Sequence, residues 1–222
     1  SSRAFSASSR PPSGMMWPEM KTAIEAVVLL FLLTLSVAAR PDLSNPYILT
    51  RPGSYHEYKV MPKATSYRDE VVENVALPGG RKGYRSRDID ADGKNDSIYE
   101  ITPGGDLLRL KAIKPNGEVR FSPPVLSLPN LDKTKKWSRA SRSTFYGPDQ
   151  PGGYELKTST RSGRVVGSET VTVPAGTFRC LRVETVIVGL QCTEWYARGV
   201  GLVKMKAGPE EYLLLRYSSG KK

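Results

Sequence analysis

Beyond residue 39, apolar and polar residues alternate with a period of two, which is the pattern of half-buried β-strands. The runs are rich in Val, Ile, Thr and Tyr, and they recur about every 8–12 residues, as in antiparallel sandwiches and barrels. The predicted strands are Tyr55–Val60, Asp69–Ala76, Ser97–Thr102, Leu107–Ile113, Tyr154–Thr160, Arg164–Val173, Thr177–Val188, Trp195–Arg198, Leu202–Lys206 and Glu211–Tyr217. We therefore expect an all-β fold, an antiparallel meander curled into a barrel or half-barrel.

The breaks between these runs are rich in Gly, Pro, Asn and Asp, which favour turns. Pro115-Asn116-Gly117 separates two strand-like runs and predicts a hairpin. Segment Phe121–Trp137 differs because its prolines cannot donate to a β-ladder. We expect it to cross a sheet edge or to connect two halves, which makes residues 121–137 the possible internal boundary of a single β domain spanning residues 40–222.

The N-terminal region reads as a leader. Ser1–Gly14 is a Ser/Arg/Pro segment, predicted to be a disordered arm or upstream sequence. Residues 15–39 follow the order of a secretory signal peptide, with Lys21, an apolar run Ala26–Val37 and small residues before position 40. The alternative is an uncleaved membrane anchor, but the apolar run is shorter than the roughly 20 residues that a helical span needs. We expect a signal-peptide helix and a secreted or periplasmic protein.

The chain of 222 residues carries a formal net charge of +11, and loss of residues 1–39 would remove three basic and two acidic residues, leaving +10. A basic surface attracts anionic polymers. The basic clusters, such as Lys133–Lys136, lack the interleaved aromatic residues of a base-stacking surface. We expect no nucleic-acid partner, and contact with a membrane only through an uncleaved signal.

Catalytic candidates are few. His56 is the one histidine, and no GxSxG, HExxH or Gly-rich phosphate loop accompanies it. We expect it to be an exposed strand residue and the protein not to be an enzyme.

Cys180 and Cys192 are the two cysteines. In an oxidising compartment they form either a disulfide that staples the sheet or two buried thiols. A hairpin turning near Gly189 would place Cys180 well beyond Cys192 along the ladder, so the disulfide would require another turn, a bulge or neighbouring strands.

Four aspartates surround Gly93 in Arg87–Glu100. Counted from Asp88, the spacing of Asp88, Asp90, Asp92 and Asp96, with the carbonyl of Lys94, resembles DxDxDG calcium loops. Flanking residues 83–87 and 97–101 read as strands, so an EF-hand is not available. The sequence predicts a weak structural calcium site at a hairpin tip, or else a plain charged turn.

Two C-terminal stretches are more specific, Ser168–Glu184 with "VTVPAGTF" and Thr193–Lys206 with "WYARGVGLVK". Together they resemble a family of uncharacterised bacterial secreted, periplasmic and lipoprotein-type β domains with VxVPAGxF and WYAxGVGLVK motifs. The resemblance implies a barrel-like envelope protein without an established activity. The motif residues also have structural interpretations: the turn at 173–176 would bring Phe178 into the core, and Trp195 and Tyr196 would face opposite sides of one strand.

These patterns predict a non-enzymatic binding or envelope-assembly protein, with a hydrophobic small molecule or an envelope protein as its partner. The expected lining or core residues are Trp137, Trp195, Tyr154, Tyr196 and Phe178. The alternatives are an assembly factor with a filled core, and a hydrolase built around His56.

Overall fold

The computed structural model describes residues 45–90, 93–156 and 158–220. They lie within one compact unit, Leu43–Lys222. The expected N-terminal arm (1–14) and signal peptide (15–39) lie outside the described residues. Within the part that is described, no helix is long and apolar enough to cross a bilayer.

The described chain consists of strands joined by short turns, with a single 3₁₀ turn, η1 (Pro78–Gly80). The strands are β1 (Ser54–Met61), β2 (Thr65–Ala76), β3 (Lys82–Asp90), β4 (Gly93–Ile101), β5 (Leu107–Lys114), β6 (Gly117–Leu128), β7 (Lys136–Gly147), β8 (Gln150–Glu155), β9 (Ser159–Val173), β10 (Gly176–Ile187), β11 (Leu190–Ala197), β12 (Gly201–Ala207) and β13 (Glu210–Ser219).

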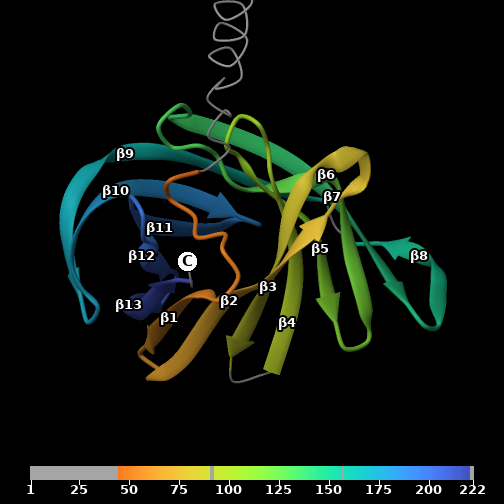
Figure 1. The fold of residues 1–222 in the computed structure, drawn as a ribbon, viewed down its shortest axis with the longest axis horizontal. Coiled ribbons are helices and arrows are strands. Elements are labelled where there is room, and N and C mark those ends of the chain that lie inside the picture. Colours follow the sequence, from red (N-terminus) through yellow and green to blue (C-terminus); the bar gives the residue numbers. More distant parts are fainter. Residues whose placement is uncertain (1–44, 91–92, 157, 221–222) are drawn as a thin grey trace, which may run out of the picture. The chain divides into compact units, whose positions relative to one another are not determined.

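The strands form one antiparallel sheet that closes on itself (Figure 1). The order runs β6-β5-β4-β3-β2-β1-β13-β12-β11-β10-β9-β7, and a further pairing of β6 with β7 completes a 12-stranded ring. β8 lies outside the ring as a hairpin partner of β7. Closure leaves few free strand edges. The predicted all-β barrel is confirmed.

The Pro-rich segment forms part of the barrel wall, so its interpretation as a connector is wrong for Phe121–Leu128. These residues complete β6, and only residues 129–135 connect it to β7. The prolines still interrupt the ladder, because they lack a backbone donor. Pairing of β6 with β7 stops at Ser122↔Arg142, and the first half of β7 pairs on its other side with β9. The backbone ladder of the wall is therefore interrupted between the second half of β6 and the first half of β7, where Ser141 Oγ donates to the carbonyl of Pro123 at 2.7 Å.

One end of the barrel is covered by the segment that precedes β1. Asn45 donates from Nδ2 to the backbone oxygens of Gly105 and Pro129, at 2.9 and 3.2 Å. The carbonyl of Pro46 accepts a hydrogen bond from the backbone N–H of Gly199. These partners belong to three different inter-strand loops, and Figure 1 shows the segment running across the barrel end toward β1. The segment thus ties together loops on opposite sides of the ring.

Buried apolar residues fall into two clusters. The first lies around the lumen and contains Tyr47, Val71, Tyr84, Leu107, Leu108, Leu126, Leu128, Leu131, Trp137, Val183 and Tyr196. The second lies where the β9–β10 hairpin meets β11–β13, and contains Tyr58, Val173, Cys180, Trp195, Ala197, Val200, Val203 and Leu214.

The turn after β9 joins the second cluster to β13. The backbone N–H of Ala175 donates to the carbonyl of Leu214 at 3.0 Å, and Phe178 packs against the cluster. Trp195 belongs to the second cluster and Tyr196 to the first. The structural interpretation of both sequence motifs is therefore confirmed.

Candidate functional site

The lumen of the barrel contains a cavity of about 470 Å³. Its wall is rich in tyrosine, which offers aromatic surface and a hydroxyl on the same side chain. These tyrosines are Tyr47, Tyr58, Tyr67, Tyr84, Tyr99 and Tyr196. Apolar residues such as Leu128, Ile187 and Leu202 also line it. The cavity reaches the interrupted wall, since Val125 of β6 and Ser141 of β7 both face it.

The first charged region of the lumen contains carboxylates from β2 and β3. Tyr67 Oη donates to Asp88 Oδ1 at 2.7 Å, and Ser86 Oγ donates to Asp69. Burial and the nearby Asp69 charge raise the pKa of Asp88 to about 6. The hydrogen bond from Tyr67 and the charge of Arg109 oppose this rise only in part. Burial also raises the pKa of Asp69. Asp88 therefore holds a proton more readily at mildly acidic pH than an exposed aspartate does.

Arg109 of β5 lines the same cavity, and its charge acts on both carboxylates. One guanidinium nitrogen donates to Ser97 Oγ at 2.8 Å, and the guanidinium lies 5.6 Å from the centre of the Phe121 ring. Its positive charge lowers the pKa values of both Asp69 and Asp88, against the larger effect of burial. Arg109 thus partly neutralises the carboxylate region.

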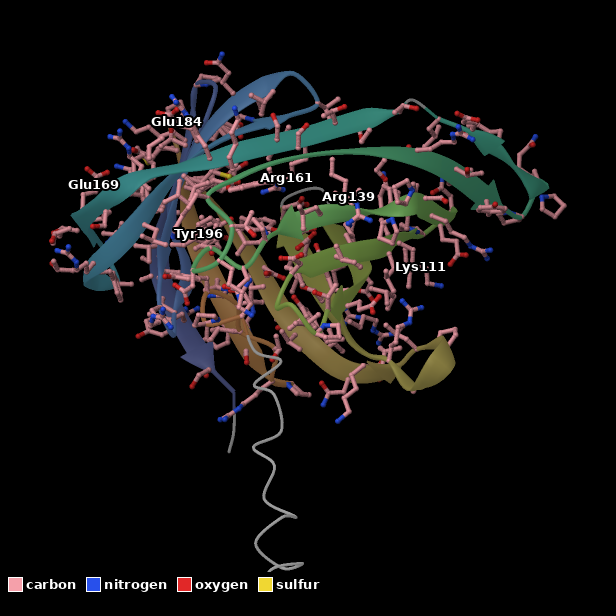
Figure 2. All side chains as sticks on the ribbon, turned by 90° about the horizontal axis from the view of Figure 1, so that it is seen from above. Lys111, Arg139, Arg161, Glu169, Glu184 and Tyr196 are labelled. Atoms are coloured by element: carbon pink, nitrogen blue, oxygen red, sulfur yellow. The ribbon has the colours of Figure 1, made fainter. Side chains whose placement is uncertain are left out.

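The second charged region is cationic and lies on β7 and β9. Arg139 and Arg161 are direct cross-strand partners, and both line the cavity. Figure 2 labels both arginines, which lie near each other beside these two strands. Arg161 is paired with Glu194 at 3.2 Å, and Tyr196 Oη donates to the same carboxylate at 3.3 Å. Burial raises the pKa of Glu194, and the Arg161 charge opposes this rise.

His56 does not occupy the exposed position expected of it. The side chain is buried at the capped end of the lumen, and Nε2 lies 2.6 Å from the carbonyl oxygen of Val200. Desolvation lowers its pKa, so the ring is neutral near pH 7 and Nε2 is the donor. Gly201 makes this contact possible, because a Cβ there would lie 2.8 Å from Nε2. Nε2 is therefore used in a structural hydrogen bond.

The residues of the predicted calcium loop are distributed over both faces of the β3–β4 hairpin. Asp88 opposes Asn95 in the ladder and faces the lumen. Asp96 opposes Arg87 and forms an ion pair with it at 2.8 Å. A second ion pair joins Asp96 to Arg85 at 3.5 Å. Asp90 opposes Gly93 at the hairpin tip, and Lys94 opposes Ile89 one position further along the ladder. Asp92 lies outside the described residues. The hairpin thus separates Asp88 from Asp96, and across the described ranges no group of three or more acidic, Cys or His side chains is placed to hold a metal.

Of the two alternatives for Cys180 and Cys192, the structure has the pair of buried thiols and not the disulfide. Both thiols are free and buried. The β10–β11 hairpin turns at Val188-Gly189, which sets Cys180 opposite Ala197 and Cys192 opposite Thr185. The two cysteines therefore lie several ladder positions apart, too far for a disulfide.

The five aromatic residues expected in the core or in a cavity lining lie in different environments. Tyr196 lines the cavity, Trp137 and Trp195 are core residues, and Phe178 packs against the second cluster. Tyr154 on β8 is 47% exposed and packs against Phe145.

Sequence reasoning did not identify the three lumen arginines, Arg109, Arg139 and Arg161. They occur among many scattered basic residues, and β7 was not predicted as a strand. The available signal was alternation within "KWSRASRS" (residues 136–143). Every second residue there is buried or half-buried, although most of these side chains are polar, and Arg139 and Ser141 line the cavity.

Comparisons with known proteins agree with this architecture. Residues 147–210 match the DUF3108-like family model, a region that holds both C-terminal motifs. No curated protein sequence matches the chain.

Two solved structures resemble the fold. One is a candidate exported protein with a YmcC-like fold from Bacteroides fragilis, at 13% identity and a TM-score of 0.50, covering 78% of this chain and 98% of that one. The other is a candidate lipoprotein from Parabacteroides distasonis, at 16% identity and a TM-score of 0.47, covering 79% and 99%. At this identity the first likeness concerns the fold alone.

Proposed function

We propose that this barrel is the binding domain of an exported envelope protein, and that it holds a small, partly hydrophobic molecule in its lumen. The observation that carries the proposal is the cavity of about 470 Å³. Small-molecule sites commonly have about 300–1,000 Å³ and combine apolar and aromatic walls with a few polar groups. The tyrosine-rich wall matches that description.

A hollow lumen supports binding over the alternative of an assembly factor with a filled core. Protein interiors are normally packed to crystal-like density, and a void forfeits dispersion contacts on every wall atom. The second cluster includes Leu214 and Val203, both at 0% exposure, so this chain is able to fill a core fully. The empty volume of the lumen is then best explained by a ligand.

We propose binding without catalysis. His56 Nε2 is engaged by Val200, and Ser54 Oγ donates to the carbonyl of Arg51 at 2.6 Å, so these neighbours do not form a nucleophile–base pair. Export is supported by the signal-like residues 15–39 of the sequence.

The proposal is tested by native mass spectrometry of the protein purified from cells under mild conditions. The expected result is a bound species of small-molecule mass that is released on unfolding. Ser127→Trp should abolish it, because Ser127 lines the cavity and an indole there would occupy the ligand volume. Thr170→Trp is the matched control, since Thr170 is exposed on β9.

Wild-type protein that carries no adduct and takes up neither dodecanoate nor dodecan-1-ol in titration would contradict the proposal. Equal loading of wild type and of Ser127→Trp would place the ligand elsewhere and would contradict it as well.

A further inference from the structure

We propose that Arg139 and Arg161 form the binding site for the anionic head group, a carboxylate or a phosphate, of an amphipathic ligand in the lumen. This inference rests on the proposed function, because it assigns the ligand class for the same cavity.

The first argument is the pairing of two like charges. Arg139 and Arg161 occupy directly opposed positions on β7 and β9, where side chains on one face lie about 4.5–5.5 Å apart at Cβ. Like charges in such positions destabilise a sheet. Both side chains line the cavity and are only partly exposed, so screening by solvent is reduced. An anion between the guanidinium groups would turn this repulsion into attraction.

The second argument is the charge balance of this region. Glu194, at 2% exposure, is the partner of Arg161, and it also accepts a hydrogen bond from Tyr196. Within the described ranges Arg139 has no ion-pair or hydrogen-bond partner, and Nε of Arg161 is buried without one. The carboxylate of Glu194 therefore pairs with Arg161 alone. One positive charge and several donor N–H groups remain for a ligand.

The third argument is the distribution of charge along the lumen. The carboxylates Asp69 and Asp88 lie with Arg109 on β2, β3 and β5, whereas the pair of arginines lies on β7 and β9. Tyrosine and aliphatic side chains line much of the rest of the cavity. An amphipathic anion would be oriented by this polarity. Its head would contact the arginines and its apolar part would lie along the aromatic wall, because an anion near Asp69 would be repelled.

The chemistry of arginine indicates the head group. A guanidinium presents a planar set of donors that matches a carboxylate or phosphate with two parallel hydrogen bonds. Ser141 and Ser159 are the next pair along β7 and β9 on the same face and also line the cavity, so hydroxyl groups are available near the arginines. A neutral lipid would leave the charge of Arg139 without a partner.

The test compares two probes of equal chain length, dodecanoate and dodecan-1-ol, by isothermal titration calorimetry with wild type, Arg139→Gln and Arg142→Gln. Arg142 is the matched control because it lies on the same strand, is 63% exposed and pairs with Glu155 outside the lumen. Arg139→Gln should weaken dodecanoate roughly ten- to hundredfold, as expected for loss of a charged hydrogen-bond partner. Binding of dodecan-1-ol should be unchanged, and Arg142→Gln should bind both probes like wild type.

Arg139 is chosen over Arg161 because removing Arg161 would leave Glu194 buried without its cation. If Arg139→Gln does not fold, the preference of the wild type for dodecanoate over dodecan-1-ol tests the anionic head group by itself. Arg139→Lys then tests whether the planar guanidinium group is required.

The outcomes separate the two proposals. If neither probe binds to wild type, the proposed function fails. If both bind with equal affinity and Arg139→Gln changes neither, the lumen is a binding site but the anionic head group is wrong. If inorganic phosphate binds as tightly as dodecanoate and depends equally on Arg139, the ligand is a free anion and the amphipathic assignment is overturned.

Discussion

The two apolar clusters of this barrel are built differently. The second cluster, under the β9–β10 hairpin, is filled, and its centre consists of fully buried Leu214 and Val203. The first cluster surrounds a cavity lined by tyrosines, arginines and carboxylates. Buried charge usually costs stability. The filled cluster stabilises the fold, whereas the lumen keeps buried charge beside empty volume. Under the proposed function, a bound molecule would make these features of the lumen favourable.

The largest expected effect comes from comparing a truncation in the second cluster with a truncation on the cavity wall. Leu214→Ala should lower the free energy of unfolding by about 2–5 kcal/mol, because it opens a void in a filled core. Val125→Ala, on the cavity wall, should cost roughly 1 kcal/mol or less, since that side chain already borders empty space. Urea unfolding followed by tryptophan fluorescence measures both. Equal losses would mean that the lumen is packed like the second cluster.

A smaller effect is expected from the two aspartates on opposite faces of the β3–β4 hairpin. The pKa of Asp88 in the folded state is raised from 3.8 to about 6, so the folded protein holds this proton more tightly than the unfolded chain. Stability from this group is greatest below pH 4 and falls as the pH rises through about 6. At pH 7, Asp88→Asn should therefore raise the free energy of unfolding by about 1–3 kcal/mol.

Asp96 provides the control of opposite sign. Arg87 lowers the pKa of Asp96, so this carboxylate stabilises the fold above its unfolded pKa and that stabilisation is lost on acidification. Asp96→Asn should destabilise the protein at pH 7. Urea midpoints measured from pH 4 to pH 8 separate the two variants. Destabilisation by Asp88→Asn at pH 7 would show that burial of the Asp88 charge does not destabilise the fold.

The smallest effect concerns the thiols. Cys180 and Cys192 are free and buried, and burial raises the pKa of Cys180 to about 11 and also raises that of Cys192. Both should react with a thiol reagent only after unfolding, and reductant should leave the melting temperature unchanged. A drop of several degrees on adding reductant, with no free thiol in the denatured protein, would show that the two are joined.

The contrast between the filled cluster and the polar lumen also explains which strands were predictable from the sequence. Strands with an apolar inward face, such as β5 and β10, show the alternation that was recognised, and the Pro-Asn-Gly hairpin between β5 and β6 is confirmed. β7 was missed because Arg139 and Ser141, which line the lumen, and the buried Ser143 are all polar. Apolar alternation is therefore lost where the wall lines a cavity.

The candidate site was still harder to predict, because it depends on register between distant segments. Arg139 and Arg161 oppose each other only through the pairing of β7 with β9, across the excursion to β8. The calcium pattern, in contrast, is local in sequence, yet strand alternation turns Asp88 inward and Asp96 outward. In a strand-rich chain, local spacing therefore predicts a cluster of metal ligands only when the face of each residue is known.

The most direct test of the central claim is an NMR titration of ¹⁵N-labelled protein with dodecanoate. Ligand in the lumen predicts amide shift changes concentrated at cavity residues, including Ser127, Ser141, Arg161 and Tyr196, with Val203 and Leu214 unaffected. Shifts confined to outward-facing residues, or no shifts at saturating probe, would contradict the assignment of the lumen as the binding site.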